Sequence, residues 1–165
     1  MLFLVYLAVF LLAATPFLEV VGVIPIGVAA GLPALNVTIV ALLGNLATIW
    51  LLILLIDKFK QWRARRQASK GQAAEGKRHK RAAQIWKKYG LPGLAIISPF
   101  LIGSHLGAML AMSFGGTKRL VGIWMTASIV AWSILAGIFS HYGVDWLFSQ
   151  TGRDGFLVDF LRDQS

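Results

Sequence analysis

The sequence predicts an all-α integral membrane protein made of two inverted repeats, each a broken re-entrant helical hairpin followed by one transmembrane helix. Of its 165 residues, 57% are hydrophobic and only 14% are charged, whereas a soluble domain usually carries about 25% charged residues. Twelve of the 16 Lys and Arg residues lie between Asp57 and Gly90. Apolar stretches on both sides of this basic segment are long enough to span a bilayer, which takes about 20 residues.

The first apolar stretch, residues 1–31, contains residues that interrupt a membrane helix, namely Pro16, Pro25, Gly27 and Gly31. Proline removes a helical hydrogen bond and disfavours helical geometry in the residue before it. A broken helix at membrane depth must be buried in protein or line a watery cavity. We therefore expect a re-entrant hairpin here, with a single kinked span as the alternative.

Two apolar stretches with few interruptions, residues 34–56 and 120–142, predict transmembrane helices. They contain the polar side chains Asn45, Thr48 and Ser128. Hydrogen bonds between neighbouring helices are enough to explain polar groups at such positions.

The stretch over residues 91–116 is broken like the first, here by Pro99, Gly103 and Gly107. In both broken stretches small residues lie four apart, a spacing that lets helix backbones approach closely. Exposed helix ends at the breaks could instead bind an anion through their free N–H groups. We expect a second re-entrant hairpin, because it keeps Lys118 on the cytoplasmic side, as the positive-inside tendency favours.

Residues 57–90 form a basic linker that we expect to face the cytoplasm, since Lys and Arg are retained on the inner side during insertion. Two helices are predicted in it, one ending near Ser69 and one from about Ala73 to Tyr89. The charge sets topology and also suits anionic lipid headgroups. The residues predicted to contact anionic lipid are Lys58, Lys60, Arg63, Arg65, Arg66, Lys87 and Lys88. Nucleic acid is not expected as a partner, because this charge lies between membrane segments.

The chain divides into two halves of one design, residues 1–56 and 91–142, each a broken hairpin with one span. Thr15-Pro16-Phe17-Leu18 is echoed 83 residues later by Ser98-Pro99-Phe100-Leu101. One hairpin and one span make an odd number of crossings, so the second half is inverted and the tail, residues 143–165, lies outside a bacterial inner membrane. Inverted repeats with broken helices are a recurrent transporter plan.

Glu19 and His105 are the candidate substrate-binding or proton-binding residues. An ionisable side chain inside an apolar segment is costly, and it usually faces a cavity, a partner or a transport path. His105 lies close to the repeat-related position of Glu19, so the two could be neighbours that exchange a proton. The alternatives are a solvated carboxylate near the outer interface and a structural, hydrogen-bonded histidine.

The sequence contains no pattern typical of catalysis or metal binding. It has no cysteine, and none of its three histidines has metal-ligand spacing with another. It also lacks a Ser/His/Asp set, an HExxH sequence and a phosphate-binding glycine loop. We expect no enzymatic activity, no metal and no cofactor.

Two sets of residues form a family pattern. The first is Glu19-Val20-Val21-Gly22-Val23-Ile24-Pro25-Ile26-Gly27, followed by Gly31 and Gly44-Asn45; the second is Pro99, Gly103, Gly107 and Ala108. In these residues the chain resembles the "putative small multidrug export protein" family, a relative of the DedA, or VTT-domain, membrane proteins. The resemblance covers about residues 15 to 142 and implies re-entrant hairpins in inverted repeats. Val21 stands where the family has an arginine, and the arginine of the second DedA hairpin has no counterpart here.

The resemblance and the repeat plan together predict a small inner-membrane transporter, proton-coupled, for lipophilic or cationic small molecules. One alternative is a DedA-like flippase or scramblase of lipid or undecaprenyl phosphate. A second alternative is a non-transporting accessory subunit of a larger membrane complex. Because the chain has few membrane elements, we expect a homodimer, with membrane lipids as its other partners.

Overall fold

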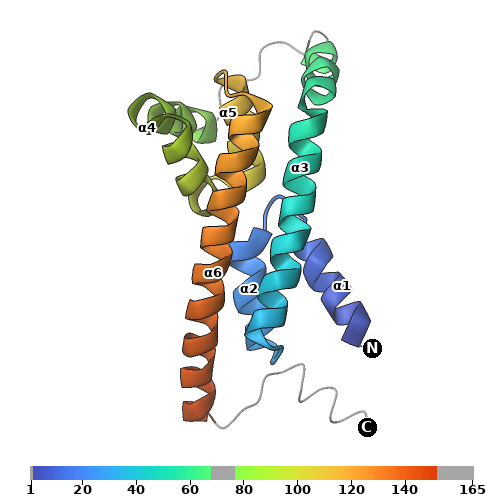
Figure 1. Cartoon of the computed structure of the whole chain (residues 1–165), viewed down its shortest axis with the longest axis vertical. Helices are drawn as coiled ribbons and strands as arrows, with labels where there is room; N and C mark the ends of the chain where they lie inside the picture. Colours follow the sequence, from blue (N-terminus) through green and yellow to red (C-terminus); the bar gives the residue numbers. More distant parts are fainter. Residues whose placement is uncertain (1, 68–76, 152–165) are drawn as a thin grey trace. The chain divides into compact units, whose positions relative to one another are not determined.

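The computed structural model describes residues 2–67 and 77–151, and all regular secondary structure in this part of the chain is helical. The prediction of an all-α protein is confirmed. The helices in these residues are α1 (Leu2–Ala13), α2 (Glu19–Ala29), α3 (Ala34–Gln67), α4 (Lys77–Leu101), α5 (Ser104–Ser113) and α6 (Lys118–Thr151) (Figure 1).

The two longest helices are apolar enough to cross a membrane. The apolar segment of α3 is Ala34–Ile56 and that of α6 is Lys118–Val144. The first coincides with a predicted span, and the second is two residues longer at each end than predicted. Both segments expose large apolar side chains, such as Leu43 and Phe139. An apolar surface of this kind is typical of a membrane-facing protein.

The helices form two compact units. The first comprises residues 1–47 and 129–165, so far as these are described, and the second comprises residues 48–128. In the first unit α1 and α2 pack against each other, and in the second α4 packs against α5. Because α3 and α6 each contribute one part to each unit, every unit contains a hairpin and a part of both long helices.

The first hairpin reverses direction between α1 and α2. The hydroxyl of Thr15 donates a hydrogen bond to the carbonyl of Leu12 (2.6 Å) and thereby closes α1, and Pro16 follows. The helix α2 then starts at Glu19 and continues through Pro25, so the predicted break at this proline is wrong. The proline ring is exposed, and its missing N–H removes a single hydrogen bond from an 11-residue helix.

A left-handed glycine ends α2. Gly31 has φ 93°, a conformation that glycine adopts without steric cost. The N–H of Leu32 donates to the carbonyl of Gly27 (3.2 Å), and the N–H of Gly31 donates to the carbonyl of Val28 (2.9 Å). This is the Schellman pattern, which terminates a helix and turns the chain. It directs the chain into α3.

The helix α1 runs along α3 in the same direction. The side-chain amide of Asn36 donates to the hydroxyl of Tyr6 (3.3 Å), and further along both helices Gly44 lies directly against the backbone carbonyl of Phe10. A β-carbon at residue 44 would collide with that oxygen. Since α2 leads back to the start of α3, both ends of the first hairpin lie at the same end of α3.

The helices of the linker differ from their predicted bounds. The helix α3 ends at Gln67, and α4 begins at Lys77. The predicted helix end at Ser69 and the predicted start at Ala73 fall in residues 68–76, outside the described residues.

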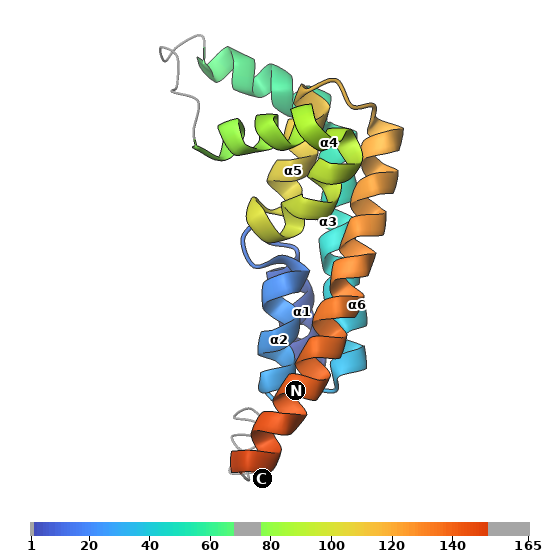
Figure 2. The same cartoon turned by 90° about the vertical axis from the view of Figure 1, so that its left-hand side faces the viewer.

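The helix α4 is kinked and longer than predicted. Gly90 has φ 64° and ψ −156° in the middle of it, and helical geometry then resumes as far as Leu101. Figure 2 shows α4 changing direction along its length. The predicted helix end at Tyr89 coincides with this interruption, and a second helical segment follows it, because glycine accommodates the kink and the apolar sequence after it is helical. Pro99 also lies inside this helix and not at a break.

The second hairpin reverses at Gly103, which has φ 90°. Its N–H donates to the carbonyl of Ser98 (2.6 Å), and α5 begins at the next residue. At the other end of α5, Gly115 has φ 101° and the N–H of Gly116 donates to the carbonyl of Ala111 (2.9 Å). The end of α5 therefore has the same Schellman hydrogen bond as the end of α2.

Both ends of the second hairpin lie together. The ring of Trp86, which lies four residues before the kink of α4 at Gly90, is 5.5 Å from the ring of Phe114, which follows α5. The ammonium group of Lys118 donates to the carbonyl of Leu54 (3.2 Å), close to the end of the apolar segment of α3. The hairpin thus starts and finishes near the same end of that segment.

Corresponding backbone features of the two halves lie 84 residues apart. Left-handed residues precede and follow the second arm of each hairpin, at Glu19 (φ 47°) and Gly31 in the first and at Gly103 and Gly115 in the second. The helices α3 and α6 also begin 84 residues apart and contain 34 residues each.

Burial along the two long helices follows the same offset. The buried positions on α3 include Val37, Ala41, Gly44, Asn45, Ile49 and Ile56, and 84 residues later the buried positions on α6 include Val121, Met125, Ser128, Ile129, Ser133 and Ser140. The two halves therefore share the start of the long helix, its buried face and the left-handed positions of the hairpin.

Candidate functional site

Glu19 is a buried carboxylate in a strained backbone conformation. Its side chain is only 2% exposed, so it is not the solvated carboxylate of the alternative interpretation. Among the described residues it is the only one other than glycine with a positive φ, at 47°. Such a conformation costs on the order of 1–3 kcal/mol and persists where the surrounding structure imposes it, often at functional sites.

The helix α2 explains why Glu19 points inward. Glu19 is its first residue, and Val20, Val23 and Ile24 form a buried face beside it. The N–H of Gly22 donates to the carbonyl of Leu18 (3.0 Å). This hydrogen bond forms the first turn of α2, immediately after the break in the hairpin. A negative charge in the first turn also interacts favourably with the helix dipole. The break therefore holds a carboxylate at a helix N-terminus and away from water.

His105 forms the second polar centre. It is the second residue of α5 and is 8% exposed. Its Nε2 atom lies 3.0 Å from Oγ1 of Thr48, within hydrogen-bond distance. The imidazole can donate or accept in this pair, according to its tautomer, because a hydroxyl does both. The structure thus brings together two residues that the sequence singled out separately, one in the second hairpin and one in the first span.

The predicted pair of Glu19 and His105 stays a prediction. Glu19 belongs to the first compact unit and His105 to the second. In the 84-residue correspondence the counterpart of Glu19 is Gly103, two residues before His105. Glu19 and Gly103 share the left-handed backbone, and the carboxylate is present in the first half alone.

Polar residues of the spans occupy different surroundings. Asn45 is fully buried in the first unit. Ser128 is 4% exposed, and its hydroxyl has no hydrogen-bond partner in the described part of the chain. Ser98, which the sequence did not single out as a site, is fully buried and donates to the carbonyl of Ala95 (3.2 Å). The sequence feature that could have indicated Ser98 is the repeated motif, in which Ser98-Pro99 corresponds to Thr15-Pro16.

The predicted packing glycines lie at close contacts or at chain reversals. Gly27 lies against Val37 and Gly107 lies against Ser98, with no room for a β-carbon at either position. Gly31 and Gly103 instead supply positive φ angles where the chain turns. Of the other predicted helix-breaking residues, Pro16 alone lies between helices.

One of the predicted lipid-binding residues has a described side chain. Lys58 is exposed on α3. The side chains of the remaining residues of that prediction, Lys60, Arg63, Arg65, Arg66, Lys87 and Lys88, lie outside the described residues. The described part of the chain has no group of three or more His, Cys, Asp or Glu side chains able to hold a metal ion.

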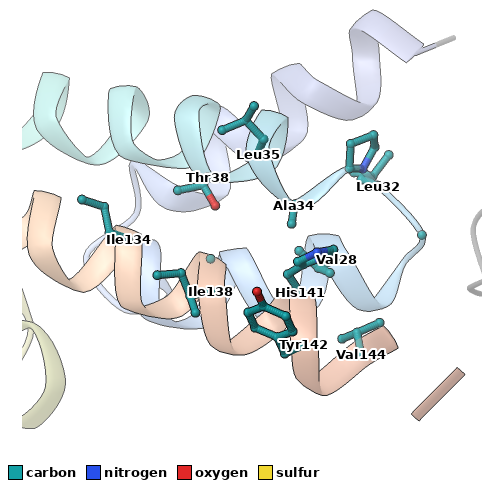
Figure 3. Close-up of a pocket in the computed structure, with 13 residues that line it drawn as sticks. Val28, Leu32, Ala34, Leu35, Thr38, Ile134, Ile138, His141, Tyr142 and Val144 are labelled. Atoms are coloured by element: carbon teal, nitrogen blue, oxygen red, sulfur yellow. The ribbon is translucent and has the colours of Figure 1, made fainter. Parts of the chain in front are cut away.

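The first unit contains a cavity of about 780 Å³ that the sequence did not indicate. The turn between α2 and α3, the start of α3 and the C-terminal part of α6 surround it (Figure 3). Most of its lining is apolar, with Thr38, His141 and Tyr142 as its polar members. A local sequence pattern could not reveal it, because the lining residues lie about 100 positions apart along the chain.

Comparison with known proteins gives one family. Residues 19–135, more than half of the chain, match the family model described as "Putative small multi-drug export protein". The match begins at Glu19 and includes both Thr48 and His105. No curated protein and no solved structure matches the chain.

Proposed function

The chain belongs to the family described as "Putative small multi-drug export protein", and from this premise we propose that it is a proton-coupled transporter of lipophilic or cationic small molecules in a bacterial inner membrane. Its two long apolar helices and the family description support a membrane location. The basic linker on the cytoplasmic side is part of the proposal.

The buried Glu19 carboxylate is the observation that carries the proposal. Burying a charged carboxylate is costly, so a proton or a cation that neutralises it stabilises the site. A site that accepts one or the other couples the release of a cationic substrate to the uptake of a proton. In this mechanism Glu19 is the shared binding site, and its position at a hairpin break leaves it close to chain segments that are able to move.

His105 and Thr48 supply a second site for a proton in the second unit. Either nitrogen of an imidazole ring can carry a proton, and the threonine hydroxyl orients one of the ring nitrogens of His105 at 3.0 Å. We propose that His105 receives or supplies protons on the path, with Thr48 as the residue that positions the ring.

The arrangement of the hairpins supports the transporter plan. Each hairpin starts and ends near one end of an apolar segment, as the contacts of Asn36 with Tyr6 and of Lys118 with Leu54 indicate. This arrangement is consistent with re-entrant hairpins, in which broken helices line a cavity or are buried in protein.

Antiparallel long helices support an inverted repeat. In the first unit Gly137 of α6 lies against Thr38 of α3. Residues before Thr38 and residues after Gly137 line the same cavity, so the two helices run in opposite directions there. In the second unit the indole of Trp50 donates to the hydroxyl of Thr126 (3.1 Å) and lies against Gly122. Since α3 and α6 are corresponding helices of the two halves, their opposite directions favour inverted repeats.

Transport of a phosphate-bearing lipid, as in the DedA-like alternative, has less support. Phosphate recognition relies on Arg or Lys side chains or on helix N-termini. The sequence has no Lys or Arg in Ala34–Ile56 or from Leu91 to Thr117. A cationic or uncharged lipophilic substrate fits these segments better.

The test is transport in proteoliposomes that contain the purified full chain. Ethidium movement is followed by fluorescence after a pH gradient is imposed in either direction. The proposal expects gradient-dependent transport by the wild type, at least about tenfold slower transport by Glu19→Gln, and substantial recovery in Glu19→Asp, which restores the carboxylate. Size-exclusion chromatography of each variant checks its folding.

Two outcomes would contradict the transporter. Wild-type protein that moves no ethidium under any gradient and purifies only with another membrane protein would favour the accessory subunit. Glu19→Gln protein that transports at the wild-type rate would remove Glu19 from the mechanism. Cross-linking in the membrane tests the proposed homodimer separately.

A further inference from the structure

We propose that the cavity of the first unit binds a small lipophilic molecule that carries aromatic rings, a single hydrogen-bonding group and no negative charge. The cavity lies within one compact unit, so its walls are defined without reference to the other unit. The inference deepens the proposed function, on which it rests for the cavity's role in transport, by naming a site for the body of the substrate. Binding itself is independent of that role.

The size of the cavity suits a single small ligand. Its volume is about 780 Å³, and sites for drug-sized molecules usually measure about 300–1,000 Å³. A molecule of two or three rings fits this space. The two acyl chains of a phospholipid exceed it.

The lining determines the charge of the ligand. Among the described residues, no Lys, Arg, Asp or Glu side chain lines the cavity, and its walls are formed by apolar side chains such as Leu32, Leu35, Ile134 and Ile138 (Figure 3). A phosphate or carboxylate would be desolvated here without a cationic partner, which is costly. An uncharged molecule, or one whose positive charge is spread over rings, avoids that cost.

Thr38 provides the polar contact. Its hydroxyl is buried and has no hydrogen-bond partner within the described residues. Figure 3 shows the hydroxyl turned toward the space between α3 and α6. Because Gly137 has no side chain, the hydroxyl packs close to the backbone of α6, where a β-carbon would lie 2.6 Å from it. Rotation of the Thr38 side chain about its Cα–Cβ bond would turn this hydroxyl from α6 into the cavity, where an amine or hydroxyl of the ligand would satisfy it.

Tyr142 and His141 provide aromatic contacts. Their rings lie 5.2 Å apart with an angle of 46° between their planes, and both residues line the cavity. Tyr142 is 69% exposed, and tyrosine is typical of the membrane–water boundary. Its ring can stack on an aromatic ligand or interact with a delocalised cation. The ligand therefore enters beside these rings from the interfacial region.

The test measures binding of N-phenyl-1-naphthylamine to the full chain in nanodiscs. This probe is uncharged, has aromatic rings and one N–H group, and fluoresces in apolar surroundings. Fluorescence of empty nanodiscs is subtracted to remove partitioning into lipid. We expect saturable binding by the wild type and a loss of at least about tenfold in affinity for Ala34→Trp, which fills the cavity from the start of α3. Ala47→Trp, an exposed alanine on the same helix, keeps wild-type affinity.

A second variant tests the polar contact. Thr38→Val keeps the shape of the side chain and removes the hydroxyl, so it lowers affinity for N-phenyl-1-naphthylamine several-fold. It leaves affinity for 1-phenylnaphthalene, which has no N–H group, unchanged.

Several results would overturn the proposal. The first is the absence of saturable binding by the wild type. The second is wild-type affinity in Ala34→Trp, or a loss in Ala47→Trp as large as that in Ala34→Trp. The third is displacement of the probe when phosphatidylglycerol replaces phosphatidylcholine in the nanodisc, which would assign the cavity to lipid. Wild type that binds the probe but transports no ethidium leaves this site in place and overturns the proposed function. Wild type that transports ethidium but shows no saturable binding does the reverse.

Discussion

The ring nitrogen Nε2 of His105 lies 3.0 Å from the hydroxyl oxygen of Thr48, and this contact joins the second hairpin to the first span within one compact unit. A buried imidazole in an apolar helix needs such a partner, since an unsatisfied buried polar group is costly. The contact also fixes which ring nitrogen faces α3.

Replacing Thr48 by valine should destabilise the protein by about 1–3 kcal/mol, because the imidazole of His105 loses the hydroxyl while the shape of the side chain is kept. Thermal unfolding in detergent measures the change. Thr48→Ser, which retains the hydroxyl, is the matched control and should stay within about 0.5 kcal/mol of the wild type. A Thr48→Val protein as stable as the wild type, together with a less stable Thr48→Ser protein, would show that the methyl contact, and not the hydrogen bond, holds the helices.

Replacing Gly44 by alanine should cost on the order of 1–3 kcal/mol, since the new β-carbon meets the backbone carbonyl of Phe10, which cannot rotate away. The same change at Gly143 introduces a β-carbon into open space on α6 and should stabilise the helix by about 0.5–1 kcal/mol. Unfolding midpoints of the two variants should therefore move in opposite directions. A stable Gly44→Ala protein would mean that α1 does not pack closely on α3.

Single cysteines at Thr117 and Gly143 should label from opposite sides of the membrane. A re-entrant second hairpin returns Thr117 to the cytoplasmic side and leaves Gly143 outside, and the chain has no cysteine of its own to interfere. A membrane-impermeant maleimide applied to right-side-out and inside-out vesicles measures this. Labelling of Thr117→Cys from outside and of Gly143→Cys from inside would show that the hairpin is an ordinary span.

Hydropathy predicted the long helices well because bilayer thickness determines how many apolar residues a span needs. Both predicted boundaries of the segment Ala34–Ile56 agree with the structure. The breaks were placed less well where proline was taken as their cause, and correctly at Gly31 and Gly103. Pro25 and Pro99 lie inside helices, where each removes one hydrogen bond, and the actual reversals depend on left-handed residues such as Gly103.

The candidate site was predicted in part. Glu19 and His105 were recognisable because ionisable groups are rare in apolar segments. The contact of His105 with Thr48 was not predictable, because it depends on which faces of distant helices meet. The cavity beside Thr38 was missed for the same reason, since its two walls belong to α3 and α6.

At position 19 the left-handed backbone favours glycine for stability, whereas the proposed function requires a carboxylate. Glycine would relax a conformation that costs on the order of 1–3 kcal/mol, yet it would remove the carboxylate. Laboratory evolution selected for heat resistance alone should therefore enrich glycine or asparagine at position 19, while selection for drug resistance of the host should restore glutamate. Under the proposed function, the most stable form of this protein and its most active form are then different sequences.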